Sequence, residues 1–139
     1  MNGRLKLIQY VAELAQYFLR ETNGLLPFAV LLDKEGEVKQ LMLDWQEESI
    51  DARELATALE AVIKVRFRFD SIIAGVVCVD VLYSANKEAL KHDAIQMKLL
   101  MKEEVNYFYQ TYITADKTFV FSEIVKDNMT YDRLSEFSE

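Results

Sequence analysis

The sequence predicts an α+β fold in which two main helices pack on a largely antiparallel sheet of about five or six strands, in two layers. Apolar residues recur at helical spacing in two segments, one near the start of the chain and one around residue 60. Between and after these segments, short runs rich in Val, Ile, Tyr and Phe are separated by turn residues, as strands are. In chain order, the segments give α-β-β-α-β-β-β-β.

The first two elements of the sheet follow a helix predicted over residues 4–23. The apolar stripe of this helix consists of Leu5, Ile8, Val11, Ala12, Ala15, Phe18 and Leu19. We expect Gly24 to be the left-handed residue that ends the helix. A β-hairpin then joins residues 28–32 to residues 38–45, and Gly36 lies in its turn, where a positive φ is favourable.

The second helix has the clearest start signal in the chain. Asp51 is a good N-cap, Glu54 follows three residues later as in a capping box, and Ile50 and Leu55 have the spacing of a hydrophobic staple. These signals predict a helix over residues 52–67. Its end stays open, because residues 65–69 also alternate as a strand does.

The remaining sheet is predicted from four apolar segments. Residues 71–84 are predicted to form the central strand. Because this strand is apolar on both faces, we expect other elements to cover the sheet above and below it. Gly75 marks either a bulge or a close approach within it. After a polar connection over residues 85–91, strands are expected at residues 94–102, 105–114 and 118–125.

The domain organisation that follows is a single domain over residues 1–125 and a polar, acidic tail over residues 126–139. The tail either frays or forms one helical turn on the sheet. The order helix–hairpin–helix–strand resembles the start of Roadblock-type dimerisation domains, although no sequence motif accompanies this likeness.

Composition excludes several classes of function. One His, one Cys and four Gly in 139 residues leave little material for metal clusters, hydrolytic triads or phosphate loops, so we expect no metal and no cofactor. A net charge of −7 disfavours nucleic acid and anionic membranes as partners. Cys78 cannot form an internal disulfide, and no segment resembles a signal peptide or a membrane span, which together predict a cytoplasmic protein.

Asp80 and His92 are the two residues that could carry chemistry. Asp80 interrupts an apolar strand, so it is either a carboxylate with a raised pKa that binds a ligand, or a structural group that faces solvent or is bonded by Arg66, Arg68 or the backbone. His92 would meet Asp80 only if their strands pair. We expect a surface histidine instead, because no nucleophile completes a site.

Two clusters of like charge are present. Arg66 and Arg68, with Lys64, are the only dense basic cluster, and they either contact an anion or a nucleic acid or form a solvated helix end. Asp44, Glu47 and Glu48 belong to an acidic run that either receives a basic partner or is explained by the turn and helix cap beside it.

Aromatic residues crowd the last strands. Tyr107, Tyr109 and Tyr112 either lie on an exposed sheet face that binds a partner, or pack across the strands and stabilise the sheet. If they are exposed, a homodimer that shares this sheet is one outcome.

These observations lead to three functional hypotheses. The first is a non-catalytic domain that binds a protein partner through an aromatic sheet face or an acidic rim, as an inhibitor of the immunity type or as a dimeric scaffold or regulatory subunit. The second is a small-molecule sensor or carrier with a cleft between helix and sheet. The third is an acid–base enzyme that uses Asp80 and His92. The first is the leading hypothesis, so an enzyme is not expected.

Overall fold

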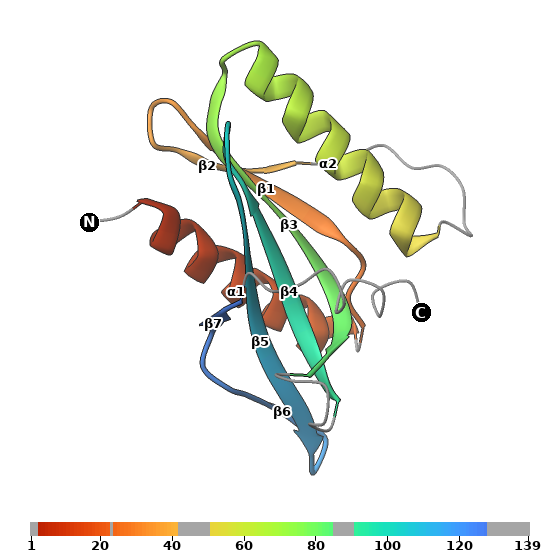
Figure 1. Ribbon diagram of the computed structural model, residues 1–139. Coiled ribbons are helices and arrows are strands. Elements are labelled where there is room, and N and C mark those ends of the chain that lie inside the picture. Colours follow the sequence, from red (N-terminus) through yellow and green to blue (C-terminus); the bar gives the residue numbers. More distant parts are fainter. Residues whose placement is uncertain (1–2, 23, 42–50, 85–90, 128–139) are drawn as a thin grey trace.

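The protein is described by a computed structural model over residues 3–22, 24–41, 51–84 and 91–127 (Figure 1). The described residues form two helices and seven strands, in the order α-β-β-α-β-β-β-β-β. These are α1 (Gly3–Thr22), β1 (Phe28–Asp33), β2 (Val38–Leu41), α2 (Ala52–Arg68), β3 (Ile72–Tyr83), β4 (His92–Leu100), β5 (Val105–Ala115), β6 (Thr118–Phe121) and β7 (Val125–Lys126). The predicted α+β class is confirmed.

The strands form one open sheet in the order β2-β1-β3-β4-β5-β6, and β7 pairs with β5. Every pair is antiparallel. β3 and β4 lie at the centre, as the apolar pattern of residues 71–84 predicted for β3.

The two helices cover opposite faces of this sheet, so the predicted two-layer arrangement is wrong in its number of layers. α1 packs against alternate residues of β1, β3 and β4, among them Val30, Val76 and Met97. α2 packs against the intervening residues, among them Leu31 and Val77. Successive strand residues point to opposite faces, and Figure 1 shows the sheet passing between the helices. Apolar residues on both faces of β3 were the sequence signal for this third layer.

The ends of the helices follow local chemistry, with one exception. The carboxylate of Asp51 accepts a hydrogen bond from the backbone N–H of Arg53 (2.8 Å), which confirms the N-cap. Gly24, in contrast, does not adopt the predicted left-handed conformation. At this end of α1, the Thr22 hydroxyl lies 2.8 Å from the carbonyl oxygen of Phe18 and 2.9 Å from that of Gly24. Both contacts are local to the last turn of α1.

The hairpin turn is built as predicted. Gly36 has a φ of 88°, and the Asp33 carboxylate accepts hydrogen bonds from the backbone N–H groups of Glu35 (3.0 Å) and Glu37 (2.9 Å). These bonds hold the pKa of Asp33 below its ordinary value, with the largest contribution from Glu37. Ile50 and the part of the second hairpin strand beyond Leu41 lie outside the described residues.

Gly75 marks a close approach and not a bulge. A Cβ at this position would lie 2.9 Å from two side-chain carbons of Ile63 on α2. The register irregularity of β3 lies elsewhere, where Leu32 pairs with Ala74 but Asp33 pairs with Ile72. The glycine therefore allows α2 to pack close to the sheet.

The strand predicted over residues 118–125 is divided into two short strands. β6 ends at Phe121, and a separate short strand, β7, continues the sheet to Lys126, one residue past the expected limit of the domain. Asp116 and Lys117, in the turn between β5 and β6, both have positive φ, as a two-residue hairpin turn of type I′ requires. Of the predicted tail, residues 128–139 lie outside the described part of the chain.

Candidate functional site

Asp80 lies near the end of β3 on the face that α1 covers, and its side chain remains exposed to solvent. The hydroxyl of Tyr112 on β5 donates a hydrogen bond to its Oδ1 at 2.9 Å. The partner is thus Tyr112, and not Arg66 or Arg68. Desolvation raises the pKa of Asp80, the bond from Tyr112 opposes this shift, and the carboxylate of Asp93 adds to it.

His92 does not meet Asp80. It is the exposed first residue of β4 and lies directly opposite Tyr83 on β3. Because Tyr83 is three residues from Asp80 on the same strand, Asp80 and His92 point to opposite faces of the sheet. The acid–base pair considered from the sequence is therefore not formed in the structure.

The tyrosines of β5 are largely internal. Tyr109 is 1% exposed and Tyr112 is 7% exposed, whereas Tyr107 is partly buried. Tyr109 stacks on Tyr83 with ring centroids 4.2 Å apart, and burial raises its pKa to about 12. The expectation that Tyr109 and Tyr112 line an exposed aromatic face is wrong, because the two helix layers and the neighbouring strands enclose them. They stabilise the sheet instead.

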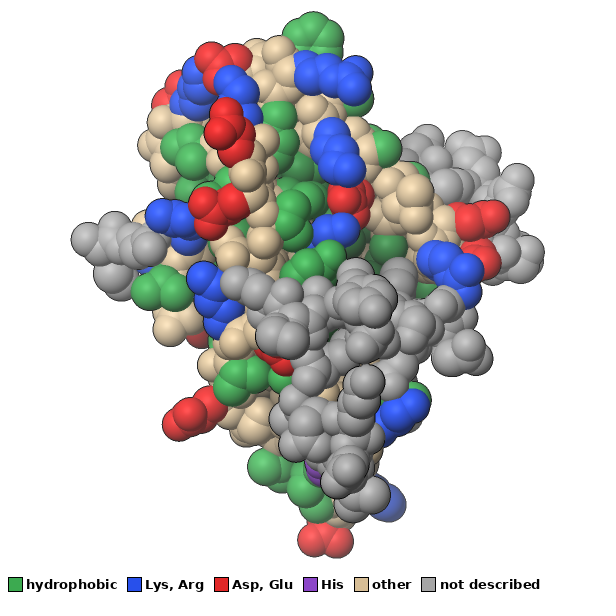
Figure 2. Space-filling model, viewed as in Figure 1, with side chains coloured by type: hydrophobic (Ala, Val, Ile, Leu, Met, Phe, Trp, Pro, Cys, Tyr) green, Lys and Arg blue, Asp and Glu red, His purple; other side chains and the backbone are tan. Residues whose placement is uncertain are grey.

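The basic cluster lies at the exposed end of α2. Arg68 and Lys64, four residues apart on the helix, line a groove of about 620 Å³ beside the β4–β5 turn, and Arg66 is not among its lining residues. Acidic side chains, Glu103 and Glu104, also line this groove. On the face drawn in Figure 2, acidic and basic side chains are likewise interspersed, without a continuous basic patch.

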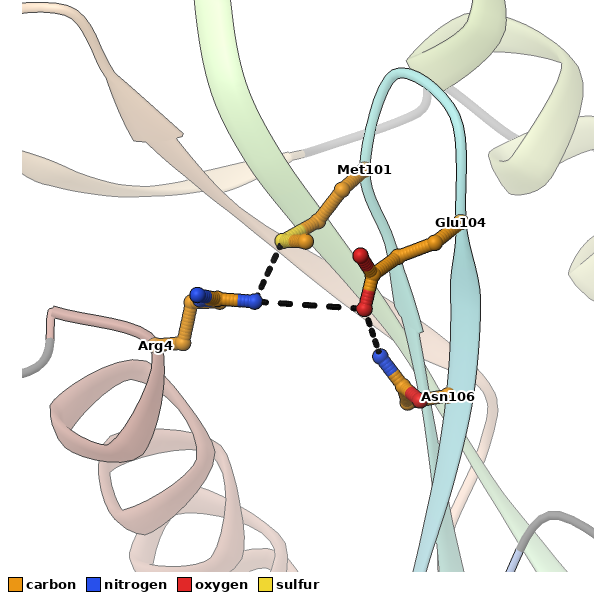
Figure 3. A network of polar contacts seen from close by, with 4 residues as sticks. All are labelled: Arg4, Met101, Glu104 and Asn106. Carbon is orange, nitrogen blue, oxygen red and sulfur yellow. Dashed lines mark hydrogen bonds and ion pairs between the residues drawn. The ribbon is translucent and has the colours of Figure 1, made fainter.

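A small network of polar contacts connects the β4–β5 turn to the start of α1 (Figure 3). The Arg4 guanidinium lies 3.9 Å from Oε2 of Glu104 and 3.7 Å from the sulfur of Met101. The side-chain amide of Asn106 donates to the same Glu104 oxygen at 2.8 Å. Glu104 therefore has a structural role in joining the helix to the sheet.

The remaining candidates from the sequence have different outcomes. Asp44, Glu47 and Glu48 lie outside the described residues, so the acidic rim stays a prediction. Cys78 is fully buried, and this burial raises the pKa of its thiol. Among the described residues, no group of three or more His, Cys, Asp or Glu side chains is placed to hold a metal ion. In the same part of the chain, no helix has the length and apolar character needed to cross a membrane.

An apolar hollow of about 380 Å³ lies at the β2 edge of the sheet. It is lined by Phe18, Thr22, Gly24, Leu26, Pro27, Phe28, Gln40, Leu41, Leu55 and Leu59. Phe18 belongs to α1 and Leu55 to α2, so side chains from both layers meet there, past the edge of the sheet. Leu26 is 68% exposed, and apolar atoms dominate the lining. The hollow has the composition typical of a binding site.

The β2 strand beside this hollow has backbone groups that point outward. The N–H of Asp33 donates to the carbonyl of Glu37 (2.9 Å), so these two residues form a hydrogen-bonded pair. Such pairs alternate with non-bonded ones along an antiparallel ladder. Val38 and Gln40, which lie opposite Leu32 and Val30, therefore direct their N–H and C=O groups away from β1. In the described part of the chain, no strand pairs with this outer side of β2.

A second concavity, of about 260 Å³, lies between α2 and the sheet. Four of its lining residues have long polar or charged side chains: Arg53 and Glu60 on α2, and Gln96 and Lys98 on β4. Thr57, Ala56, Val77 and Val79 complete the lining. We refer to this concavity as the α2 cleft.

Sequence reasoning missed both concavities. Gln96 and Lys98 are the polar residues in a strand whose other face, with Ile95, Met97 and Leu99, is apolar. That alternation suggests a solvent-facing side, and only the placement of α2 on that side turns it into a cleft. The hollow is lined by residues of α1, β1, β2 and α2 that are distant in sequence, and no local pattern brings them together.

Comparison with protein-family models, with curated proteins and with solved structures found no significant match to this chain. The likeness to Roadblock-type domains therefore remains one of element order.

Proposed function

We propose that this protein is a non-catalytic interaction domain that binds an extended segment of a protein partner at the β2 edge. The partner segment adds a strand to β2 and places a bulky apolar side chain in the adjoining hollow. A single observation carries this proposal, namely that an apolar hollow lies directly beside an edge strand with outward backbone groups.

Strand addition supplies affinity through backbone hydrogen bonds, and a neighbouring pocket supplies specificity through one side chain. Val38 and Gln40 offer the backbone groups, and Gln40 and Leu41 also line the hollow. Exposed edges are usually protected by charge or by cover, because they pair readily with other chains. Of the four β2 residues, Lys39 carries the only charge, and the Asp33 carboxylate lies 3.3 Å from its ammonium group.

This proposal agrees with the leading hypothesis from the sequence, a non-catalytic domain that binds a protein partner. It differs in the surface that binds the partner. Tyr109 and Tyr112 are buried, so the partner surface that we propose is the β2 edge and not the sheet face of β5. A cytoplasmic location stays a prediction and is compatible with the buried thiol of Cys78. A second copy of the chain as partner, which would give a homodimer, is one outcome of the test below.

The test uses peptide display followed by binding measurements on two variants of one residue. Gln40→Pro removes the outward N–H, and proline is tolerated at the outward positions of an edge strand. Gln40→Ala removes the same side chain but retains this N–H, so it is the matched control. We expect selection from a random peptide library to yield peptides with a bulky apolar residue that bind the wild type and Gln40→Ala, and lose at least about tenfold in affinity for Gln40→Pro.

Two results would contradict the proposal. One is a selection that yields no binding peptide, and the other is selected peptides that bind Gln40→Pro as tightly as the wild type. Analytical ultracentrifugation of the wild type, Gln40→Pro and Gln40→Ala tests whether the chain associates with itself. A concentration-dependent dimer that is lost in Gln40→Pro but retained in Gln40→Ala would make the partner strand a second copy of the chain.

A further inference from the structure

The α2 cleft is separate from the β2 edge and has its own polar chemistry. The register places Val79, Gln96 and Tyr109 in one row across β3, β4 and β5, and Val77, Lys98 and Tyr107 in the next row. α2 covers this face. The polar side chains of Gln96 and Lys98 therefore lie in an otherwise largely apolar layer between helix and sheet.

Gln96 has a buried acceptor without a partner. Its side chain is 4% exposed, and its Nε2 donates a hydrogen bond to the hydroxyl of Tyr109 at 3.1 Å. Within the described part of the chain, this is the only polar contact of the side chain, so its Oε1 accepts no hydrogen bond. Buried polar atoms are nearly always bonded. An open acceptor that lines a cleft is therefore a position that a ligand donor would satisfy.

Beside Gln96, the carboxylate of Glu60 is paired with two lysines. The ammonium group of Lys98 lies 2.8 Å from Oε1 of Glu60, and that of Lys64 lies 3.3 Å from Oε2 of the same carboxylate. Burial alone would lower the pKa of Lys98, but the ion pair with Glu60 outweighs it and raises that pKa. Burial alone would raise the pKa of Glu60, but the two lysines lower it below its usual value. Both groups are thus charged at neutral pH.

We propose that the α2 cleft binds a small zwitterion of the α-amino acid class, whose ammonium group bonds Gln96 and Glu60 and whose carboxylate bonds Lys98. A ligand with a single charge would find an opposite charge and a like charge within the same few ångströms. A zwitterion contacts both partners and adds no net charge to a partly buried site. The volume of about 260 Å³ limits the ligand to a small molecule.

The experiment measures the thermal unfolding of the whole chain with free L-α-amino acids at millimolar concentration. Each amino acid is compared with its N-acetyl derivative, which is an anion, and with its methyl ester, which is a cation. We expect at least one amino acid to raise Tm by about 2 °C or more. Neither of its blocked derivatives should do so. Overturning results are the absence of a shift with every amino acid, or an equal shift with a blocked derivative.

A pair of lysine variants tests the location. Lys98→Met removes the ligand contact and leaves Glu60 paired with Lys64, whereas Lys64→Met removes an equal charge from the same carboxylate outside the cleft. We expect Lys98→Met to weaken amino-acid binding by at least about tenfold and Lys64→Met to preserve it. Equal effects of the two variants would contradict the proposal.

A second variant guards against misfolding of Lys98→Met. Thr57 lies at the exposed rim of the cleft, so Thr57→Phe should occlude it without disturbing the core. With the circular dichroism spectrum unchanged, we expect the ligand-induced rise in Tm to disappear. Retention of the rise in this variant would place the ligand elsewhere and overturn the assignment.

Discussion

Asp80 illustrates how the surroundings of one side chain determine its chemistry. In the sequence it is a carboxylate within an apolar strand, and both a ligand site and a structural role are compatible with that position. In the structure the carboxylate accepts a bond from Tyr112 and lies near Asp93 on the same face. Its pKa is raised chiefly by desolvation, so the charged form is less favourable in the folded protein than in the unfolded chain.

The raised pKa of Asp80 predicts how the stability of the protein depends on pH. A group whose folded pKa exceeds its unfolded value binds more protons in the folded state, so its contribution to stability falls as pH rises between the two values. We expect Asp80→Asn to be more stable than the wild type at pH 7, and the difference to shrink as pH falls through the carboxyl range. The asparagine oxygen can still accept the bond from Tyr112.

The measurement for Asp80→Asn is urea unfolding at several pH values. Asp93→Asn is the control, because it removes the neighbouring charge without altering the Tyr112 bond, and it should raise the stability at pH 7 by a smaller amount. A stability difference between Asp80→Asn and the wild type that is independent of pH would show that the carboxylate is not the cause.

At the scale of elements, the packing of α2 on β3 depends on the missing side chain of Gly75. A Cβ at Gly75 would lie 2.9 Å from Cδ1 and from Cγ2 of Ile63, closer than real carbon atoms approach. The Gly75 backbone does not have a positive φ, so alanine is unfavourable there for steric reasons alone. Ile63 itself is fully buried, which leaves the helix little freedom to move away.

We predict that Gly75→Ala destabilises the protein by about 1–3 kcal/mol through overpacking. Ile63→Ala should cost about 2–5 kcal/mol through the cavity it leaves. In the double variant the new methyl group partly fills that cavity, so the combined loss should be smaller than the sum of the single losses. A double-mutant cycle by urea unfolding checks this, and strictly additive losses would mean that the two sites do not touch.

At the scale of the whole molecule, one sheet serves two cores. β1, β3 and β4 contribute alternate residues to the core beneath α1 and to the core beneath α2. Neither helix can lose its contacts without exposing strands that also support the other. The three layers should therefore unfold together.

Leu7 on α1 and Leu59 on α2 test this cooperativity, because both are almost completely buried on opposite faces. We expect Leu7→Ala and Leu59→Ala each to cost about 2–5 kcal/mol, and the double variant to lose nearly the sum. Calorimetry should show a single transition, with equal calorimetric and van't Hoff enthalpies, in all variants. Two separate transitions would show that the helices stabilise independent units.

Local sequence signals predicted the elements that depend on near neighbours. Asp51 begins α2, Gly36 has its positive φ, and the apolar stripes placed both helices, because caps, turns and periodicity act within a few residues. Gly24 was the exception, because its φ is not positive. Strand boundaries shifted by a few residues, because pairing partners decide where a strand stops.

The candidate sites depended on contacts that are distant in sequence, and there the sequence alone was insufficient. Asp80 was identified as a distinctive residue, but its partner Tyr112 lies 32 residues away on another strand. Gln96 and Lys98 were not identified as site residues. Their side of the sheet becomes a cleft only because α2 packs over it.

By itself, the sequence determined the class of the fold, the two helices, the hairpin turn and the central, doubly apolar strand, since these follow from periodicity and short-range backbone chemistry. Only the tertiary structure decided which face of the sheet each helix covers, that Asp80 and His92 point apart, and that a hollow and a cleft form at the edge and beneath α2. The physical reason is that strand order and helix placement arise from summed contacts between distant segments, which no local pattern records.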